Sequence, residues 1–303
     1  MKKLLLIDTF NFLHRAYHAL PITLTNSQGE PTNAVYGVAS MLLSVTDLIK
    51  PDYTVAALDD IAPTFRVEEF TGYKAHRKPM EEELSSQIPK MFEILDCFGI
   101  KKISLPGYEA DDVIGTLVSK FTGRDLQIII VSNDQDMWQL IGVNSLVLNP
   151  DTKGNASWIG QKEALARFGF DPVYIPQYKA LRGDPSDNIP GVYGIGDVTA
   201  KKLIIEYKTI DEIYKNIDKI SPDKLREKLL NNYEQAIMSR GLANIIKDAP
   251  VNVDLEECKY LGNHTDAIKD VLTKYNFKSL LKRIGALDDK KISNVSKDQM
   301  ELF

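Results

Sequence analysis

The chain has 303 residues, of which 44% are hydrophobic and 26% charged, and its formal net charge is −5 at pH 7. This composition is typical of a globular protein that buries a full core, and it excludes a disordered or fibrous chain. The negative total does not exclude a nucleic-acid partner, because local basic patches decide such binding. Cys97 and Cys258 have no CxxC partner, which favours reduced thiols in a cytoplasmic protein. The apolar stretch after Lys3 ends at Asp8, too short for a signal peptide or a membrane span.

Strand-like and helical patterns alternate through the first half of the chain. The strand-like runs lie at 3–7, 53–58, 100–105, 126–132 and 144–148, and the helical patterns lie near 9–20, 34–50, 84–98, 110–121 and 134–141. This alternation predicts an α/β fold, a mostly parallel central sheet with helices on both faces. In such sheets, ligands bind at the carboxyl ends of the strands.

Acidic residues recur where these runs end, within LLLID, VAALD, PGYEADD and VSNDQD, and again in RGDPSDNIPGV. They are Asp8, Asp59, Glu109, Asp111, Asp112, Asp134, Asp136, Asp184 and Asp187. Crowded carboxylates either take up protons or ionise around a divalent metal, and an all-oxygen set suits Mg²⁺ or Mn²⁺ rather than zinc. Any single Asp here could instead be a helix N-cap, and Asp134 can do both. Capping alone does not explain why acids recur while Ser, Thr and Asn are largely absent.

From about 63 to 83 the chain becomes charged and has little continuous apolar face. Its aromatic residues are Phe65, Phe70 and Tyr73, and its basic residues are Arg66, Lys74, His76, Arg77 and Lys78. We expect this segment to stand over the acidic cleft as an arch, with phosphate contacts from the basic side chains and base stacking from the aromatic ones. The alternative is an exposed helical hairpin with surface salt bridges.

The pattern from 171 to 210 is helical, apart from the turn IPGVYGIGDVTAKKL. Its glycines, Gly191, Gly194 and Gly196, free backbone N–H groups at a helix N-terminus, a geometry that binds phosphate. Asp197 and Thr199 can cap the second helix, and Lys201 and Lys202 follow near its start. We therefore predict a helix-hairpin-helix anchor for a DNA backbone, the alternative being a simple glycine turn. Amphipathic helices are predicted for 211 to 285.

Five blocks stand in order along the chain: LLIDTFNFLHRAYHAL, TFRVEEFTGYKAHR, GYEADDVIGTL, VSNDQDMWQL and RGDPSDNIPGVYGIGDVTAKKL. Together they resemble the successive motifs of the bacterial 5′ nuclease family, which includes the 5′-3′ exonuclease domain of DNA polymerase I and stand-alone flap endonucleases. The resemblance runs from residue 2 to about 285. It implies a PIN-like nuclease domain at 1–170 with a helical arch at about 63–98, then a helical subdomain at 171–288 with a helix-three-turn-helix motif.

The resemblance also implies roles for individual residues. Asp8, Asp59, Glu109 and Asp111 would surround one metal, with Asp112 just outside its ligand set. Asp134, Asp136 and Asp187 would hold a second metal about 4 Å away, with Asp184 acting through water. Tyr73 corresponds to a base-stacking aromatic, and Lys74 and Arg77 correspond to residues that engage the scissile phosphate. The DNA contacts would come from Arg66, Lys78, Lys201, Lys202 and the 190–196 turn, and a monovalent cation such as K⁺ on that turn is a further implication.

The last residues, 289–303, form a polar tail that ends in QMELF. Gln299, Met300, Leu302 and Phe303 resemble the short peptide by which bacterial replication and repair proteins bind the sliding clamp, and apolar anchors on a flexible leash suit a groove. The alternative is a terminal strand or turn packed against the body.

We expect a cytoplasmic, monomeric 5′-flap endonuclease and 5′-3′ exonuclease that removes flaps in replication and repair. Two alternatives from other classes are a non-catalytic DNA-junction binder and a metal-dependent RNase of a related small nuclease fold. The first would require a missing metal ligand, and the second would lack the arch and the glycine hairpin.

Overall fold

The computed structural model describes residues 1–150, 156–262 and 266–286. Its centre is a six-stranded sheet in the order β3-β2-β1-β4-β5-β6. The strands are β1 (Lys2–Asp8), β2 (Tyr53–Ala57), β3 (Lys101–Ile103), β4 (Leu126–Val131), β5 (Ser145–Pro150) and β6 (Ala156–Ile159). All neighbouring pairs are parallel except β5 and β6. The predicted mostly parallel sheet is therefore confirmed, and its strand order reverses between β1 and β4.

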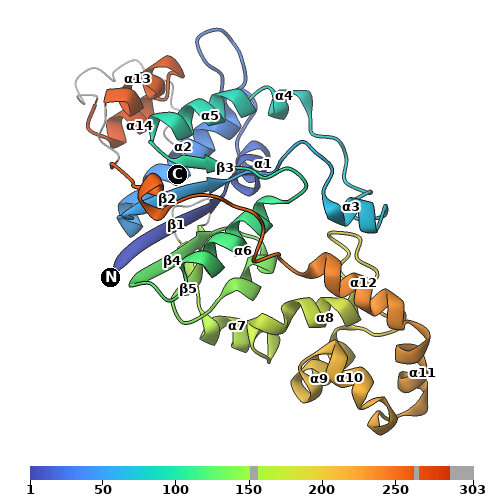
Figure 1. Ribbon diagram of the computed structural model, residues 1–303. Coiled ribbons are helices and arrows are strands. Elements are labelled where there is room, and N and C mark those ends of the chain that lie inside the picture. The colour runs from blue at the N-terminus through green and yellow to red at the C-terminus, as the bar shows by residue number, and fades with distance from the viewer. Residues whose placement is uncertain (151–155, 263–265, 287–303) are drawn as a thin grey trace.

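Helices cover both faces of this sheet, as predicted (Figure 1). One face packs against α1 (Thr9–Ala19), α2 (Asn33–Ile49), α5 (Ile88–Cys97), α13 (Asp266–Lys274) and α14 (Lys278–Arg283). The other packs against α6 (Ala110–Phe121), η1 (Gln135–Leu140), α7 (Gln161–Phe168) and η4 (Leu255–Cys258). Leu5 and Ile7 of β1 face the first layer while Leu4 and Leu6 face the second. A strand buried on both sides must be apolar throughout, which is why β1 reads as an unbroken run.

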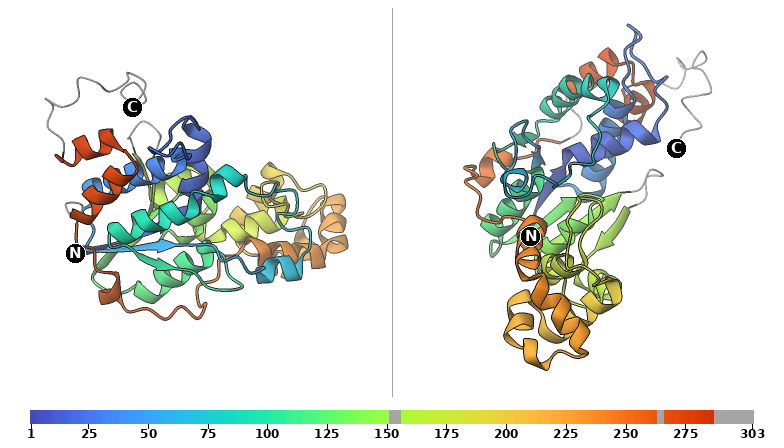
Figure 2. Two further views of the ribbon diagram at one scale, coloured as in Figure 1. Left: turned by 90° about the horizontal axis from the view of Figure 1, so that it is seen from above. Right: turned by 90° about the vertical axis from the view of Figure 1, so that its right-hand side faces the viewer.

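A helical region projects from one end of the sheet (Figure 2). It contains η2 (Pro172–Tyr174), α8 (Ile175–Arg182), α9 (Asp197–Tyr207), α10 (Ile210–Lys215), η3 (Ile217–Lys219), α11 (Asp223–Asn231) and α12 (Tyr233–Ala243). These helices enclose a separate apolar core, in which the rings of Phe168, Phe170 and Tyr178 contact one another in tilted and edge-on arrangements. Trp138 of η1 packs against Phe168 and joins this core to the α/β part.

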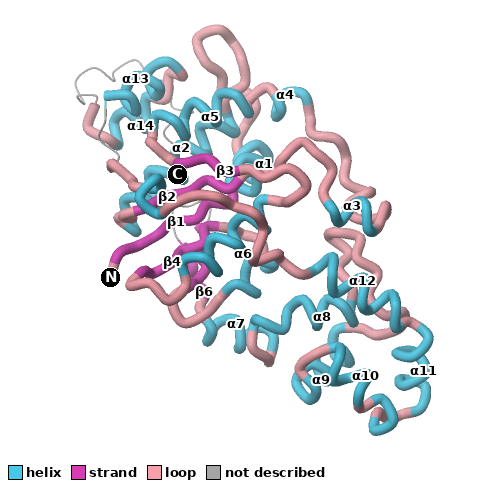
Figure 3. The backbone as a smooth tube through the Cα atoms, in the orientation of Figure 1, coloured by secondary structure: helices cyan, strands magenta, loops and turns pink. Residues whose placement is uncertain are grey.

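The arch is less helical than predicted (Figure 3). Within 63–98 the helices are α3 (Phe65–Glu69), α4 (Glu82–Ser85) and α5, and residues 70–81 form turns and loop. The loop is held by tertiary contacts instead of a helical ladder: Asn188 donates its side-chain amide to the Gly72 carbonyl at 2.6 Å, and the Lys74 N–H donates to the Asp187 carbonyl at 2.9 Å.

Four segments differ from the sequence prediction. The segment at 134–141 is a 3₁₀ helix, because Asp134 caps only a six-residue turn. The predicted strand 100–105 is reduced to Lys101–Ile103, since this edge strand pairs with β2 alone. Strand β6, whose four residues carry no long apolar run, was missed. Residues 244–254, predicted as helical, form a link without helix or strand that returns the chain from α12 to the sheet. Among the described residues, no helix combines the length and apolarity that a membrane crossing needs.

Candidate active site

Acidic side chains gather at the carboxyl end of the sheet, where the strand order reverses. Asp8 is the last residue of β1, and its Oδ2 accepts a 2.7 Å hydrogen bond from Ser132 Oγ, just past β4. Asp59 follows β2, and its Oδ1 accepts from the Ala110 N–H at 2.9 Å, which fixes the start of α6 beside it. Asp134 follows β4 and accepts from the Asp136 N–H, so its predicted capping role is confirmed.

Helix α6 adds two further acids to this end of the sheet. Glu109 immediately precedes the helix, and Asp111 lies in its first turn. Burial raises the pKa of Asp111 well above its ordinary value, and the nearby Asp8 and Asp134 carboxylates raise it further. Burial likewise raises the pKa of Asp8 to about 7, although the Ser132 hydrogen bond opposes the shift. Burial and the neighbouring negative charges therefore disfavour the ionised forms of Asp8 and Asp111.

A second group of acids lies beside the first. One carboxylate oxygen from each of Asp136, Asp184 and Asp187 lies within 4.8 Å of the others. Burial raises the pKa of Asp136 to about 7, and the charge of Asp134 adds to the shift. Asp134 thus influences both groups, because it also raises the pKa of Asp8 and Asp111.

This donor set fits hard divalent cations. A positive ion placed among the acids would remove the repulsion that raises their pKa values, and oxygen ligands are those that Mg²⁺ and Mn²⁺ prefer. Asp184 shows the effect of a nearby cation: burial raises its pKa, but the adjacent Lys179 ammonium and the hydrogen bonds from Ser186 together outweigh burial and leave the pKa lowered.

Lys179 is the residue of the site that sequence reasoning missed. It lies on α8, and its Nζ forms ion pairs with both Asp136 and Asp184. Burial lowers the pKa of Lys179, yet the two carboxylates outweigh burial and raise it. The available signal was a lysine between apolar residues in YKAL, five residues before Asp184. A lysine is rarely buried unless it is paired.

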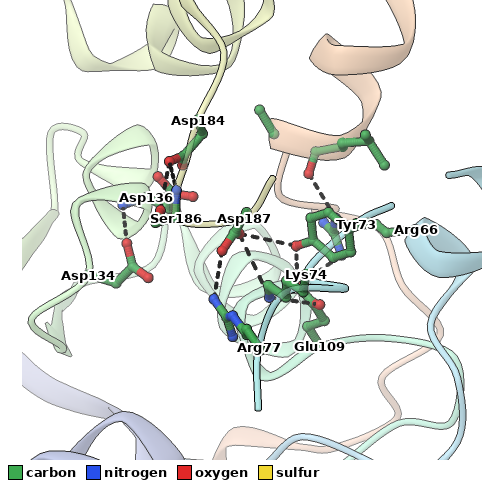
Figure 4. Close-up of polar contacts among 12 residues, drawn as sticks. Arg66, Tyr73, Lys74, Arg77, Glu109, Asp134, Asp136, Asp184, Ser186 and Asp187 are labelled. Carbon is green, nitrogen blue, oxygen red and sulfur yellow. Dashed lines mark hydrogen bonds and ion pairs between the residues drawn. The ribbon is translucent and has the colours of Figure 1, made fainter. Parts of the chain in front are cut away.

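The arch brings three side chains down onto the acids (Figure 4). Lys74 Nζ lies 2.9 Å from Glu109 Oε1 and 3.8 Å from Asp187 Oδ2, and Arg77 lies 2.6 Å from Asp187 Oδ1. Tyr73 donates its hydroxyl to Glu109 at 3.1 Å and to Asp187 at 3.3 Å. Burial lowers the pKa of Lys74, but the Glu109 and Asp187 carboxylates outweigh it and leave the pKa raised. The prediction that basic residues of this segment stand at the acidic cleft agrees with this geometry.

Two sequence predictions for this region need correction because the residues are buried. Tyr73 is only 4% exposed, packed against Ile189, Leu242 and Ala243, so its ring has no free face for base stacking in this conformation. Arg66 is 2% exposed and therefore cannot reach DNA as predicted.

Asp112 was predicted to lie just outside the ligand set of one metal, and its contacts are compatible with that place. Its side chain is 0% exposed. Both of its carboxylate oxygens are bound by Arg66 at 2.7 Å, and they also accept from the Glu109 and Ile246 N–H groups. These four hydrogen bonds use the lone pairs that a metal would require.

The glycine turn lies between α8 and α9. Gly194 and Gly196 are exposed, and Gly196, rather than Asp197 or Thr199, is the N-cap of α9. Gly191 is buried, and its N–H donates to Ser239 Oγ at 3.1 Å. The prediction that Gly191 offers its N–H to a phosphate is therefore wrong; a Cβ there would lie 2.1 Å from the Gly183 nitrogen, so close packing explains this glycine.

Basic and aromatic side chains surround the exposed part of this turn. Lys202 is exposed, whereas Lys201 lies 3.2 Å from Asp197 in an ion pair. Tyr193, which sequence reasoning did not select, is 82% exposed at the tip. The predicted clamp-binding residues Gln299, Met300, Leu302 and Phe303 lie outside the described residues.

Comparisons with known proteins match most of the chain, and the family models cover residues 3–266. The 5′-3′ exonuclease N-terminal resolvase-like domain matches residues 3–169, and the 5′-3′ exonuclease C-terminal SAM fold matches residues 170–266. The 5′-3′ exonuclease of Aquifex aeolicus is 36% identical over 95% of this chain and 96% of its own length. DNA polymerase I of Caldicellulosiruptor bescii is 42% identical over 93% of this chain, and this chain spans 33% of that polymerase.

Solved structures show the same fold. The bacteriophage T5 D15 protein co-crystallised with metal ions has a TM-score of 0.63 at 23% identity, covering 93% of this chain and 100% of its own. The catalytic core of Rad2 in complex with a DNA substrate has a TM-score of 0.59 at 14% identity, covering 93% of this chain and 92% of its own.

Proposed function

Because the chain belongs to the 5′-3′ exonuclease family, we propose that it is a divalent-metal-dependent phosphodiester hydrolase that acts on DNA as a 5′-flap endonuclease and 5′-3′ exonuclease in primer removal and repair. The observation that carries this proposal is the convergence of acids from separate segments at one end of the sheet, three of them within 4.8 Å. A non-catalytic junction binder has no use for such a costly cluster of buried carboxylates.

The acids divide between two ions, Mg²⁺ or Mn²⁺. In this proposal, Asp8, Asp59, Glu109 and Asp111 hold one ion. Asp134, Asp136 and Asp187 hold the other, with Asp184 acting through water. When bound, the ions supply activation of the attacking water and stabilisation of the leaving oxygen. Lys179 keeps Asp136 and Asp184 oriented, and its ion pairs must loosen for Asp136 to bind an ion directly and Asp184 through water.

The basic side chains of the arch act on the phosphate. Lys74 and Arg77 lie against the acids that hold the ions, so a phosphate bound to those ions would also contact the positive charges of Lys74 and Arg77. Their charges stabilise the additional negative charge that develops on the phosphoryl oxygens during hydrolysis. Tyr73 positions Glu109 and Asp187 through its hydroxyl rather than stacking on a base.

The glycine turn holds duplex DNA in this proposal. Gly194 and Gly196 are exposed just before α9, and in this proposal their N–H groups bind phosphate. Lys201 and Lys202 near the turn, and Lys78 on the arch, supply positive charge for phosphates. A monovalent cation such as K⁺ at this turn would compete with Lys228, whose Nζ already donates to the Gly194 carbonyl at 2.8 Å. We propose that the protein acts as a monomer.

Cleavage of a labelled double-flap oligonucleotide tests the function. We expect cleavage near the junction with Mg²⁺ and none with a chelator, and Asp187→Asn should lower the single-turnover rate at least about 100-fold because it removes a metal ligand. Binding of the flap without cleavage under any divalent ion would instead favour the junction binder. Cleavage of single-stranded RNA in preference to the flap would favour the RNase alternative.

We further propose that the QMELF peptide docks on the bacterial sliding clamp. Removing the last five residues should abolish retention on immobilised clamp, because the apolar anchors Met300, Leu302 and Phe303 are lost. Cleavage of a free flap oligonucleotide should not change, which controls for folding. Undiminished retention of the shortened chain would remove this proposal.

A further inference from the structure

The chain returns from the helical region to the sheet through a short segment, residues 242–246, which we call the strap. Three side chains from other parts of the fold bind its backbone. Arg66 donates to the Leu242 carbonyl at 3.0 Å and to the Asn244 carbonyl at 2.8 Å, Gln139 donates to the Ala243 carbonyl at 3.2 Å and accepts from the Ile245 N–H at 3.0 Å, and Asp112 accepts from the Ile246 N–H at 2.9 Å.

These three side chains form a buried, fully paired network, which we call the buried network. Arg66 is 2% exposed, Gln139 2% and Asp112 0%. Arg66 and Asp112 also form a two-pronged ion pair with both distances at 2.7 Å. Buried charges of this kind add little net stability compared with apolar residues, but when every group is satisfied they specify a single arrangement. The buried network therefore fixes the geometry of the strap more than it adds to the stability of the fold.

The strap lies directly on helix α6. A Cβ on Gly115 of that helix would lie 2.4 Å from Ile245 Cγ2 and 2.7 Å from the Ile246 carbonyl oxygen. Only a glycine permits this approach, so the strap is seated against the helix whose first turn carries Asp111. Asp112 of the same turn holds the strap with one oxygen and the Glu109 N–H with the other. The acids and the strap therefore share one rigid support.

The other end of the strap continues helix α12, which supports the glycine turn. Ser239 of α12 accepts from the Gly191 N–H, and Gln235 donates to the Gly191 carbonyl. The path from the glycine turn to the acids thus runs through α12, the strap and the buried network. Figure 1 shows α12 and α3 side by side where this path enters the α/β part, and the hydrogen bonds from Arg66 to the strap confirm the contact.

We infer that Arg66, Asp112 and Gln139 are positioning residues that fix which DNA phosphate reaches the acids, and so where the strand is cut. The inference rests on the proposed function, in which the turn holds the duplex and the acids perform hydrolysis. Phosphates of one strand are spaced by about 3.4 Å along the duplex axis, so a shift of that size between turn and acids moves the cut by one nucleotide. A loosened strap should allow neighbouring phosphates to compete for the site.

The test uses the full chain and a double-flap substrate whose products are separated at single-nucleotide resolution. Arg66→Lys keeps the charge but loses the two-pronged geometry, and Gln139→Met keeps the volume but loses both hydrogen bonds to the strap. We expect each variant to raise the fraction of product cut at adjacent phosphates about 5-fold, while duplex affinity stays within about 2-fold of the parent. Arg240→Lys is the matched control, because Arg240 lies on α12 but pairs with exposed Asp211.

The outcomes separate this inference from the proposed function. A parent chain that never cleaves the flap with Mg²⁺ overturns the proposed function, and with it the role inferred for the buried network. If the parent and the Arg240→Lys control cut at one phosphate while the folded Arg66→Lys and Gln139→Met variants cut at that same phosphate alone, the function stands and the inference fails. Thermal unfolding identifies the folded variants. Loss of folding in both variants would assign the buried network a purely structural role and also overturn the inference.

Discussion

Asp111→Asn should lower the single-turnover rate of flap cleavage about 10³-fold and, in the absence of divalent ions, make the protein more stable. The loss of rate follows if Asp111 is the oxygen ligand that the proposed function assigns to one ion. The gain in stability follows from the surroundings of Asp111, whose pKa is raised well above its ordinary value by burial and by the Asp8 and Asp134 charges. A variant that merely damaged the fold would lose both properties together.

The sign of the stability change depends on pH. Burial raises the pKa of Asp8 and of Asp136 to about 7, above the value of 3.8 that is ordinary for aspartate. A carboxyl whose pKa is higher in the folded state stabilises the fold fully at low pH, and this contribution is lost as pH rises from about 4 to about 7. In a chelator, the parent should therefore melt at a lower temperature at pH 8 than at pH 5. Asp111→Asn should narrow this difference, and at pH 8 it should melt about 3 °C above the parent.

The measurements are quenched-flow cleavage with Mg²⁺ and calorimetric melting with a chelator. Mg²⁺ should raise the melting temperature of the parent at pH 8, because an ion that binds only the folded state stabilises it, and should do so less for Asp111→Asn. Asp96→Asn is the matched control, since Asp96 pairs with Lys102 on the surface and should change neither rate nor Mg²⁺ response. A melting temperature for Asp111→Asn below that of the parent at pH 8 would contradict this account.

The acids were predictable from sequence because their position depends on local rules. Asp8 ends an apolar run and Asp134 begins a capped turn, and both features are visible in a few neighbouring residues. Parallel strands place their carboxyl ends together, so the strand pattern alone brings these acids to one edge. The family resemblance then supplied the grouping into two ligand sets.

The missed features depend on partners that are distant in sequence. Arg66 was predicted to be a DNA contact because its neighbours are charged, but its partners Asp112 and Asn244 come from two other segments. Lys179 was not selected because its ion pair with Asp136 spans 43 residues. No periodicity records such pairs, since a basic residue in a charged segment has the same local pattern whether it is exposed or buried. The end of helix α12 at Ala243 was likewise missed, because beyond it the Ile245 and Ile246 N–H groups bind the side chains of Gln139 and Asp112 from other segments.

Lys74→Ala should lower the single-turnover rate of flap cleavage about 100-fold while leaving duplex affinity within about 2-fold of the parent. Lys74 Nζ lies 2.9 Å from Glu109 Oε1, deep in the site and away from the exposed glycine turn proposed to bind the duplex. Its charge is therefore placed to act on the phosphate during hydrolysis rather than on the duplex.

Lys78→Ala is the matched control for this assignment, because Lys78 is exposed on the same segment. A surface phosphate contact contributes mainly to salt-dependent binding, so Lys78→Ala should weaken affinity and lower the slope of log affinity against log salt by about one, with little change in rate at saturation. Each variant removes one lysine from the arch, but Lys74→Ala should change mainly the cleavage rate and Lys78→Ala mainly the affinity for DNA. Equal losses of rate and affinity in Lys74→Ala would place Lys74 among the binding contacts, and the acids and their ions would then have to stabilise the developing charge without it.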